Sequence, residues 1–418
     1  FKEATIKGQG KDKGLFFPED ISKFSQEFLQ NLPNLSNEEI AFQVMKDFAG
    51  DEIPEAELRK IVAETIAFEI PLKKVTENIS VLELFHGPTL AFKDVGARFM
   101  SRCLGYFLKN ETRKVTVLVA TSGDTGGAVA NGFYDVEGIE VVILYPKNRV
   151  SPVQEKQLTA LGKNIHALEV NGSFDDCQAL VKQAFSDESL NEKLLLTSAN
   201  SINVARWLPQ QIYYVLALKQ WLKNNSENPV ICVPSGNFGN ICAGILAHHR
   251  GLPVEHFIAA CNVNDVVPEY LRTEILQPKE TVATISNAMD VGDPSNFVRI
   301  LELFDKEFNQ VKNKLSGYTI DDGETLKTIE RVEKDYDYVL DPHGAVAFVA
   351  LEKYLAENGG KGFFLETAHP VKFPDSVEKA TGKSVEIPKS LEELMKQGKF
   401  TTEINPQYEE LKEFLLKK

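Results

Sequence analysis

Several features that would assign a protein to a common class are missing from this sequence. No segment approaches the ~20 consecutive apolar residues that a membrane-spanning helix needs, and no charged and apolar leader stands before Gly14. We therefore expect a cytoplasmic protein with no membrane partner.

Cysteine is sparse and unpatterned. The five cysteines are odd in number, widely separated and never in a Cys-x-x-Cys pair, so neither a disulfide framework nor a zinc site is indicated. His248 and His249 are adjacent and would point to different faces of a helix, which disfavours a metal pair. We predict buried cysteines that pack as small hydrophobic residues, and no metal centre.

Basic residues are outnumbered by acidic ones, 46 to 60, which gives a formal net charge of −14. At long range this charge repels nucleic acids and anionic lipid surfaces, so we expect neither as a partner. The sequence also lacks the Gly-x-x-x-x-Gly-Lys-[Ser/Thr] loop of many nucleotide-binding enzymes. The overall charge still leaves room for a local basic pocket.

The chain does show a repeated alternation of short β-branched runs with amphipathic segments. Its 418 residues, 43% of them apolar, suffice for two or three domains with buried cores. The alternation is typical of doubly wound α/β domains with a parallel sheet, in which ligands bind beyond the carboxyl ends of the strands. The expected strands are residues 115–120, 141–145, 165–170, 230–233, 257–260 and 362–366, and helices are expected from Thr125, Ser151, Phe174, Val204, Asn240 and Gly344.

The two ends of the chain follow a different pattern. Residues 21–32, 36–48 and 55–68 carry apolar residues at helical spacing, which predicts an N-terminal helical extension. The last ~30 residues are rich in lysine and glutamate and are expected to form a solvated helical tail.

The loop after the first of these strands, residues 121–127, reads Thr-Ser-Gly-Asp-Thr-Gly-Gly and opens a helix. Its glycines let backbone N–H groups approach a ligand, and the positive end of the helix suits an anion such as a carboxylate. Serine, aspartate and glycine suit an ordinary capped turn equally well, so this loop alone does not decide between a binding site and a turn.

A second loop of the same kind, residues 234–240, reads Pro-Ser-Gly-Asn-Phe-Gly-Asn and precedes a helix of small residues. Its main-chain donors could surround a phosphate group, and the helix dipole would add about 0.3 to 1 kcal/mol. An ordinary turn is again the alternative. Two such loops in one chain favour a binding function more than one does.

Lys93 follows an apolar stretch that is interrupted by Gly87 and Pro88. A lysine that is desolvated in such surroundings has a lowered pKa and can act as a base, or as the amine nucleophile that condenses with a carbonyl cofactor. The alternative is a solvated surface lysine, which is the commoner role of this residue type.

Together these segments resemble the threonine synthases, pyridoxal-phosphate enzymes of the tryptophan-synthase β-subunit type, known as fold type II. The similarity extends over nearly the whole chain from Gly14 to about Pro388, and residues 14–18 are similar to the fungal and enterobacterial branch. The matching segments are residues 85–94, 122–126, 198–203, 235–240, 262–265, 286–290 and 366–370.

The resemblance implies a fold of two doubly wound α/β domains with an N-terminal helical extension. Residues 1–80 would form the extension and residues 391–418 a C-terminal helical tail. Residues 81–112 and 192–390 would form the larger, cofactor-binding domain. Residues 113–191 would form a smaller, mobile domain.

The resemblance also implies which residues hold the cofactor, pyridoxal 5'-phosphate. Lys93 would bind the cofactor aldehyde through its amine and, once displaced by the substrate, carry protons between carbon atoms. Residues 236–240 would hold the cofactor phosphate, and the Thr367 hydroxyl would meet the pyridine nitrogen. Asp124, where many relatives have asparagine, would line the pocket. The cofactor-binding set is Lys93, Phe92, Asp124, Gly236, Asn237, Phe238, Gly239, Asn240 and Thr367.

The implied substrate is O-phospho-L-homoserine, which would be converted with water to L-threonine and phosphate by a monomer or homodimer. Its α-carboxylate would bind Ser122, Gly123, Thr125 and Gly126. Candidates for its phosphate group lie in or beside the matching segments and offer hydroxyl, amide or cationic donors. They are Thr89, Ser151, Lys156, Ser201, Asn203 and Arg206.

Two other functions use the same loops and are kept as alternatives. One is a serine or threonine dehydratase, or a β-replacement enzyme, with the same cofactor. The other is a ligand-binding relative that has lost turnover. The segment before Lys93 and the asparagine-rich later segments argue against the first alternative, and the intact Lys93 with both glycine loops argues against the second.

Overall fold

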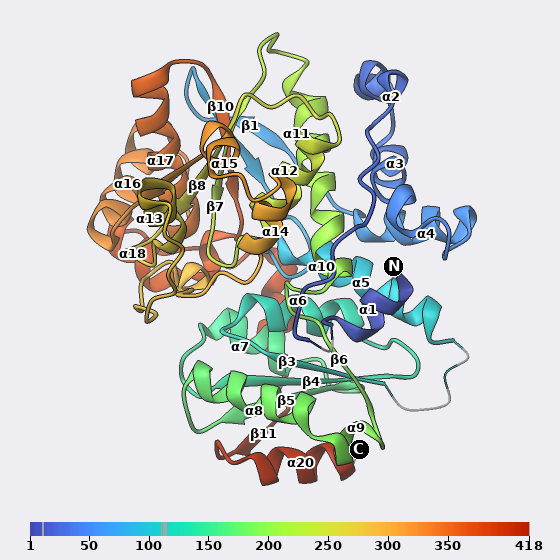
Figure 1. Cartoon of the computed structure of the whole chain (residues 1–418). Coiled ribbons are helices and arrows are strands. Elements are labelled where there is room, and N and C mark those ends of the chain that lie inside the picture. Colours follow the sequence, from blue (N-terminus) through green and yellow to red (C-terminus); the bar gives the residue numbers. More distant parts are fainter. Residues whose placement is uncertain (11, 110, 112–114, 418) are drawn as a thin grey trace. The chain divides into compact units, whose positions relative to one another are not determined.

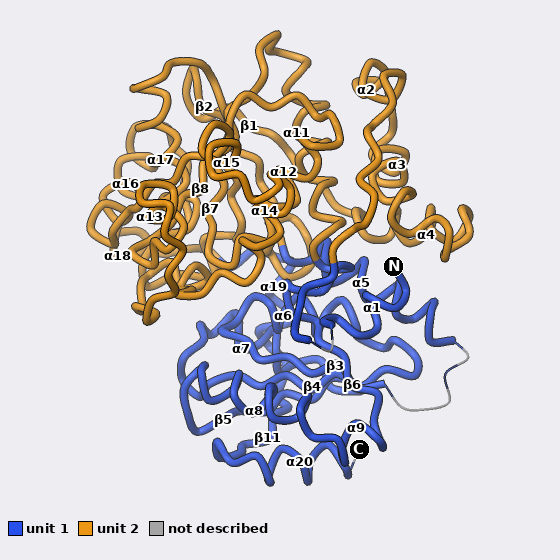
Figure 2. Tube along the Cα trace, in the orientation of Figure 1, with its two compact units in different colours: residues 1–16, 93–206, 387–418 blue, residues 17–92, 207–386 orange. Residues whose placement is uncertain are grey.

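A computed structural model describes residues 1–10, 12–109, 111 and 115–417 (Figure 1). The chain packs into two compact units (Figure 2): unit 1 comprises residues 1–16, 93–206 and 387–418, and unit 2 comprises residues 17–92 and 207–386. The domain boundary expected at residues 112 and 113 lies outside the described residues. The proposed mobility of residues 113–191 stays a prediction.

Unit 1 is built on a five-stranded parallel sheet with the order β11-β5-β4-β3-β6. Its strands are β3 (Val115–Ala120), β4 (Ile139–Pro146), β5 (Ile165–Val170), β6 (Leu195–Ser198) and β11 (Thr401–Ile404). Its helices are α1 (Lys2–Lys7), α5 (Lys93–Phe107), α6 (Asp124–Phe133), α7 (Pro152–Thr159), α8 (Phe174–Ser186), α9 (Glu188–Asn191), α19 (Lys389–Lys396) and α20 (Tyr408–Lys417), and α10 (Val204–Trp207) ends just past its boundary.

Both faces of the unit 1 sheet are buried, because helices cover each of them. Val142 and Leu144 of β4 pack in one cluster with Leu180 of α8. The intervening Ile143 faces the other side, where a Cβ on Gly126 of α6 would lie 3.1 Å from its Cγ2 atom. Burial on both faces explains why the inner strands are mostly apolar rather than strictly alternating.

Unit 2 is built on a six-stranded sheet with the order β1-β2-β10-β7-β8-β9, parallel except for β1 against β2. Its strands are β1 (Leu72–Lys74), β2 (Ile79–Glu83), β7 (Val230–Pro234), β8 (His256–Cys261), β9 (Leu315–Thr319) and β10 (Gly362–Glu366). Its helices are α2 (Gln26–Asn31), α3 (Asn37–Ala49), α4 (Glu55–Thr65), α11 (Gln211–Trp221), α12 (Gly239–His249), α13 (Val266–Thr273), α14 (Phe297–Leu303), α15 (Phe308–Lys314), α16 (Asp322–Tyr336), α17 (Pro342–Asn358) and α18 (Pro374–Thr381), with short 3₁₀ turns η1 (Leu32–Asn34), η2 (Leu208–Gln210), η3 (Asn287–Met289) and η4 (Pro370–Lys372).

The α/β fold class is confirmed, and the predicted strands 115–120, 165–170 and 362–366 have the expected bounds. Two expectations about the chain ends are corrected. The N-terminal 80 residues are not purely helical, because β1 and the start of β2 lie there and pair with the unit 2 sheet. The C-terminal segment is neither purely helical nor solvated, because β11 pairs with β5 and Leu411 and Leu415 of α20 are buried.

All five cysteines are buried and free, as predicted. Among the described residues, no helix is long and apolar enough to cross a membrane. Over the same part of the chain, no group of three or more histidine, cysteine, aspartate or glutamate residues could hold a metal ion.

Candidate active site

The loop that follows β7 in unit 2 is held rigidly at its start. The Ser235 N–H donates to the Ala260 carbonyl at 2.8 Å, which continues the pairing with β8, and the Ser235 hydroxyl donates to the Val233 carbonyl at 2.9 Å. Phe238 then adopts a left-handed conformation with φ of 61°, and α12 begins at Gly239. The first N–H groups of an α-helix have no partner within the helix, so the start of α12 can bind an anion.

This loop packs against the segment of residues 288–296. A Cβ on Gly236 would lie 2.6 Å from the Cα atom of Met289, so only glycine allows this approach. The Asn237 Oδ1 atom accepts a hydrogen bond from the Ser295 N–H at 2.7 Å, and its carbonyl accepts one from Asn296 Nδ2 at 3.0 Å. The loop is therefore supported by backbone and amide contacts with Met289, Ser295 and Asn296.

Asn240, in the first turn of α12, presents an unsatisfied donor. The Tyr214 hydroxyl lies 2.7 Å from its Oδ1 atom and 2.9 Å from its carbonyl oxygen. Its Nδ2 atom is buried and has no hydrogen-bond partner among the described residues. A buried amide donor without a partner is costly, so this atom indicates a ligand with an acceptor, beside a helix end that favours negative charge.

The carboxyl end of β10, the neighbour of β7 in the sheet, supplies a second part of the site in unit 2. Thr367 follows this strand and is buried, and its carbonyl accepts a hydrogen bond from the Phe92 N–H at 2.9 Å. The Phe92 carbonyl in turn accepts a hydrogen bond from the Tyr213 hydroxyl. Because the N–H and the carbonyl of Phe92 are both hydrogen-bonded, the backbone is fixed directly before Lys93.

Lys93 itself is the first residue of α5 and the first residue of the second segment of unit 1. The next residue, Asp94, is buried, as are Val95, Gly96 and Ala97. A Cβ on Gly96 would lie 2.6 Å from the Arg206 carbonyl oxygen, so the first turn of α5 packs directly on the backbone of α10. The helix that carries the candidate amine is thus rigidly seated in unit 1.

The predicted anion loop of unit 1 is folded around Thr121. The Thr121 Oγ1 atom accepts hydrogen bonds from the N–H groups of Gly123 at 3.0 Å and Gly126 at 2.9 Å. Gly123 has φ of 137°, a conformation that favours glycine, and α6 begins at the next residue. Ser122, Gly123, Thr125 and Gly126 thus lie together where β3 meets α6.

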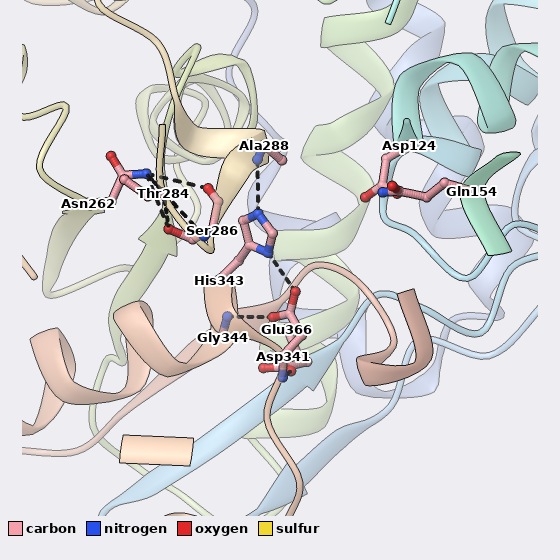
Figure 3. A network of polar contacts seen from close by, with 10 residues as sticks. All are labelled: Asp124, Gln154, Asn262, Thr284, Ser286, Ala288, Asp341, His343, Gly344 and Glu366. Carbon is pink, nitrogen blue, oxygen red and sulfur yellow. Dashed lines mark hydrogen bonds and ion pairs between the residues drawn. The ribbon is translucent and has the colours of Figure 1, made fainter. Parts of the chain in front are cut away.

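Asp124, the first residue of α6, is buried and has a defined partner. Its Oδ1 atom accepts a hydrogen bond from Gln154 Nε2 at 2.9 Å (Figure 3). Gln154 belongs to the capping box of α7, in which its Oε1 accepts the Ser151 N–H at 3.1 Å. The orientation of the Asp124 carboxylate is therefore linked to the start of α7.

Ser151, Lys156 and Asn203, candidates for the substrate phosphate, already make contacts within unit 1. Ser151 caps α7 by accepting the Gln154 N–H at 3.4 Å. The Lys156 ammonium donates to the Gln397 carbonyl at 2.5 Å. Asn203 is fully buried, and its Nδ2 atom donates to the carbonyls of Thr5 at 2.9 Å and Ser198 at 3.2 Å.

The other three candidates differ in exposure. Arg206 is buried and donates to the Ala199 carbonyl, whereas Ser201 is half-buried in a turn. Thr89, in unit 2, is buried, and its carbonyl accepts a hydrogen bond from Lys372 Nζ at 2.8 Å. None of these contacts tests a role in binding phosphate, so the six assignments stay predictions.

A buried hydrogen-bond network that sequence reasoning missed links Glu366 to Ala288, which lies against Gly236 of the 236–240 loop (Figure 3). The Asp341 N–H donates to Glu366 Oε1 at 2.7 Å, and the Asp341 Oδ2 atom lies 2.6 Å from His343 Nδ1. The Ala288 N–H donates to His343 Nε2 at 3.2 Å. Because Nε2 accepts this bond, Nδ1 carries the proton that His343 donates to Asp341.

Glu366, at the other end of this hydrogen-bond network, is fully buried. Burial, together with repulsion from Asp341 and Glu83, raises the pKa of its carboxyl group well above the ordinary range. Its only visible signal in the sequence is its place directly before Thr367. The turn Asp341-Pro342-His343-Gly344 does carry a recognisable signal, since an aspartate cap with proline in the next position is typical of a helix start.

Family models match the chain along almost its whole length. Residues 66–363 match the model described as pyridoxal-phosphate dependent enzyme. Residues 1–66 match the model of the threonine synthase N terminus, and residues 344–415 match the model described as threonine synthase, C-terminal.

Individual relatives are similar over nearly their full lengths. The threonine synthase of Serratia marcescens is 45% identical over 416 residues, which covers 100% of this chain and 96% of the relative. The crystal structure of threonine synthase from Escherichia coli matches with a TM-score of 0.92 at 44% identity, covering 100% of this chain and 96% of that one. The pyridoxal-phosphate-bound threonine synthase from Brucella melitensis matches with a TM-score of 0.93 at 35% identity, covering 99% and 95%.

Proposed function

The chain belongs to the threonine synthase family of pyridoxal-phosphate-dependent enzymes, and from this premise we propose that its substrate is O-phospho-L-homoserine. The proposed reaction eliminates phosphate from the γ-carbon and then adds water at the β-carbon, which gives L-threonine and inorganic phosphate. The structural observation that supports the cofactor site, on which this reaction depends, is the loop of residues 236–240 with the unsatisfied Asn240 Nδ2 atom.

The residues after β7 fit the phosphate group of the cofactor. Gly236 allows the loop to lie flat on Met289, the start of α12 offers N–H groups, and Asn240 offers an additional amide donor. Neutral dipoles bind a phosphate dianion without a built-in cation when the donors are preorganised. We therefore assign Gly236, Asn237, Phe238, Gly239 and Asn240 to the cofactor phosphate.

The remaining cofactor contacts are assigned to residues at the end of β10 and the start of α5. Thr367 would meet the pyridine nitrogen with its hydroxyl, and Lys93 would hold the cofactor covalently and move protons between substrate carbons. Phe92 and Asp124 would line the pocket. When bound, pyridoxal phosphate supplies an electron sink that stabilises carbanions formed at successive substrate carbons.

The substrate carries two anionic groups, which need separate binding sites. Ser122, Gly123, Thr125 and Gly126 would bind the α-carboxylate at the start of α6, where the helix dipole favours an anion. The γ-phosphate would bind donors among the six candidates. They are Thr89, Ser151, Lys156, Ser201, Asn203 and Arg206.

Product identification tests the proposal directly. The purified holoenzyme is incubated with O-phospho-L-homoserine or with L-serine, and amino acids, keto acids and phosphate are quantified. We expect L-threonine and phosphate in equal amounts from the first substrate, and no threonine from the Lys93→Ala variant. Phosphate release without threonine, or a keto acid from serine alone, would instead indicate a dehydratase or β-replacement enzyme.

We also propose that the enzyme works in the cytoplasm as a monomer or homodimer. The described residues include no helix suited to a membrane, and the chain carries a net charge of −14, which opposes binding to anionic lipids. Sedimentation equilibrium of the purified chain, whose mass is 46.6 kDa, would distinguish a monomer from a dimer.

A further inference from the structure

Helix α11 carries two adjacent tyrosines whose hydroxyl groups contact different parts of the proposed cofactor site, all within unit 2. The Tyr213 hydroxyl donates to the Phe92 carbonyl, directly before Lys93. The Tyr214 hydroxyl contacts Asn240 in the first turn of α12. Both tyrosines are buried, so neither hydroxyl is available to bulk water. Consecutive residues on a helix point about 100° apart, which explains how one helix can reach both places.

The contact of Tyr214 determines which way the Asn240 amide faces. A hydroxyl has one proton, and its shorter contact, 2.7 Å, is to Asn240 Oδ1. With Oδ1 occupied by this donor, Nδ2 must be the other end of the amide, where it has no partner among the described residues. Burial raises the pKa of Tyr214 well above its ordinary range, which keeps the hydroxyl protonated and able to donate.

The packing of α11 against α12 holds Tyr214 in this position. A Cβ on Gly244, one turn after Asn240, would lie 2.5 Å from the Tyr214 Cε1 atom. Glycine at residue 244 therefore makes room for the tyrosine ring. On the far side the ring meets Phe257 of β8 edge to face, with ring centroids 6.4 Å apart. The ring is therefore confined by contacts with α12 and β8.

The contact of Tyr213 acts on a different group. The Phe92 carbonyl precedes Lys93, and the Phe92 N–H is already bound to the Thr367 carbonyl at 2.9 Å. Tyr213 supplies the second restraint on this peptide. Removing the Tyr213 hydroxyl would take this restraint away from the peptide that leads into α5.

We propose that Tyr213 and Tyr214 are positioning residues that fix the two anchor points of the cofactor separately. Tyr214 orients the Asn240 amide toward the cofactor phosphate, and Tyr213 fixes the backbone from which the Lys93 side chain extends. The inference rests on the proposed cofactor contacts of Lys93 and residues 236–240. It predicts that each tyrosine affects one part of cofactor binding and leaves the other unchanged.

The test uses Tyr213→Phe and Tyr214→Phe, each of which removes one oxygen and keeps the ring, and compares pyridoxal phosphate with pyridoxal, which lacks the phosphate. For Tyr214→Phe we expect the dissociation constant of pyridoxal phosphate to rise about 5- to 10-fold, with that of pyridoxal unchanged. For Tyr213→Phe we expect slower borohydride-trappable attachment of both compounds to Lys93, with the ratio of their affinities unchanged. The matched control is Tyr318→Phe on β9, which removes a hydroxyl that is bound to Glu357 of α17.

A double-mutant cycle with Asn240→Ala separates positioning from a general effect on folding. The penalty of Tyr214→Phe on pyridoxal phosphate binding should disappear when Asn240 is already alanine. If either variant behaves as Tyr318→Phe does, or if Tyr214→Phe lowers the affinity for both compounds equally, the roles of the tyrosines are wrong. If borohydride places the cofactor on another residue in the unaltered chain, the cofactor assignment fails as well. Because none of these readouts needs turnover, they are independent of the proposed substrate.

Discussion

Glu366 combines burial with a pKa raised by desolvation and by the nearby Asp341 and Glu83 carboxylates. A carboxyl group whose pKa is higher in the folded chain binds a proton that the unfolded chain releases. Its contribution to stability is therefore full below the ordinary carboxyl pKa of about 4.3 and is lost as the pH rises toward the folded pKa. Glu366 thus makes the folded protein less stable as the solution becomes more alkaline.

Replacing this carboxyl by a neutral amide should remove that pH dependence. We expect Glu366→Gln to gain stability relative to the unaltered chain between about pH 5 and about pH 8, by at most about 1.4 kcal/mol per pH unit. Urea unfolding midpoints of the cofactor-free proteins at several pH values measure the difference. The exposed Glu280→Gln is the control and should show no such trend. If the difference in stability between Glu366→Gln and the unaltered chain did not change with pH, Glu366 would be ionised in the folded protein.

Gly344 should be intolerant of any side chain. A Cβ there would lie 1.6 Å from Glu366 Oε2, inside the fully buried start of α17. We expect Gly344→Ala to lower the free energy of unfolding by about 1 to 3 kcal/mol, the usual cost of overpacking a core. Thermal unfolding is compared with that of Gly398→Ala, where the structure places nothing within 4 Å of the added atom. Equal melting temperatures for the two variants would contradict the contact.

Sequence reasoning identified the parts of the candidate site that follow local rules. The loops 121–127 and 234–240 were predicted because glycine and small polar residues follow apolar runs directly. Their supporting contacts were not predicted, because Tyr214 to Asn240 and His343 to Ala288 join residues far apart in the chain. Such pairs depend on how helices and strands pack, and a single sequence carries no pattern for that.

Among the strands, the same reasoning found every inner strand except β2 and none of the edge strands. β3, β5 and β10 are mostly apolar, as burial on both faces of a sheet favours. β11, with the sequence Thr-Thr-Glu-Ile, is a short edge strand with exposed positions and looks like a loop. It forms because β5 offers a free edge and α20 buries Leu411 and Leu415 against the same core.

The position of α20 can be tested with two leucines on that helix. Leu411 is 0% exposed and Leu416 is 43% exposed. We expect Leu411→Ala to destabilise the protein by about 2 to 5 kcal/mol, because it leaves a cavity in the unit 1 core. Leu416→Ala should change stability by no more than about 0.5 kcal/mol. Chemical denaturation of both variants measures this difference in stability. Similar midpoints would indicate that α20 does not pack against the unit 1 core.

The chain as a whole crosses between its two units four times, after residues 16, 92, 206 and 386. Unit 1 therefore consists of three segments and unit 2 of two, although each has its own sheet and core. Lys93 opens a segment of unit 1 directly after such a crossing, and residues 236–240 belong to unit 2. Neither unit can be made as one continuous piece of this chain.

This arrangement predicts that removing the end of the chain damages one unit selectively. Deleting residues 387–418 removes β11, α19 and α20, all from unit 1, and exposes the edge of β5 together with apolar residues of α8 such as Leu180. Local stability follows local packing, so amide hydrogen exchange should speed up in β5 and α8. Exchange should stay slow in β7, β8 and β10, whose core contains no residue of the deleted segment. Mass spectrometry of the shortened and full chains measures both sets in one experiment. Faster exchange throughout both sheets would mean that the chain unfolds as a single cooperative body, and unchanged exchange in β5 would mean that β11 adds no stability.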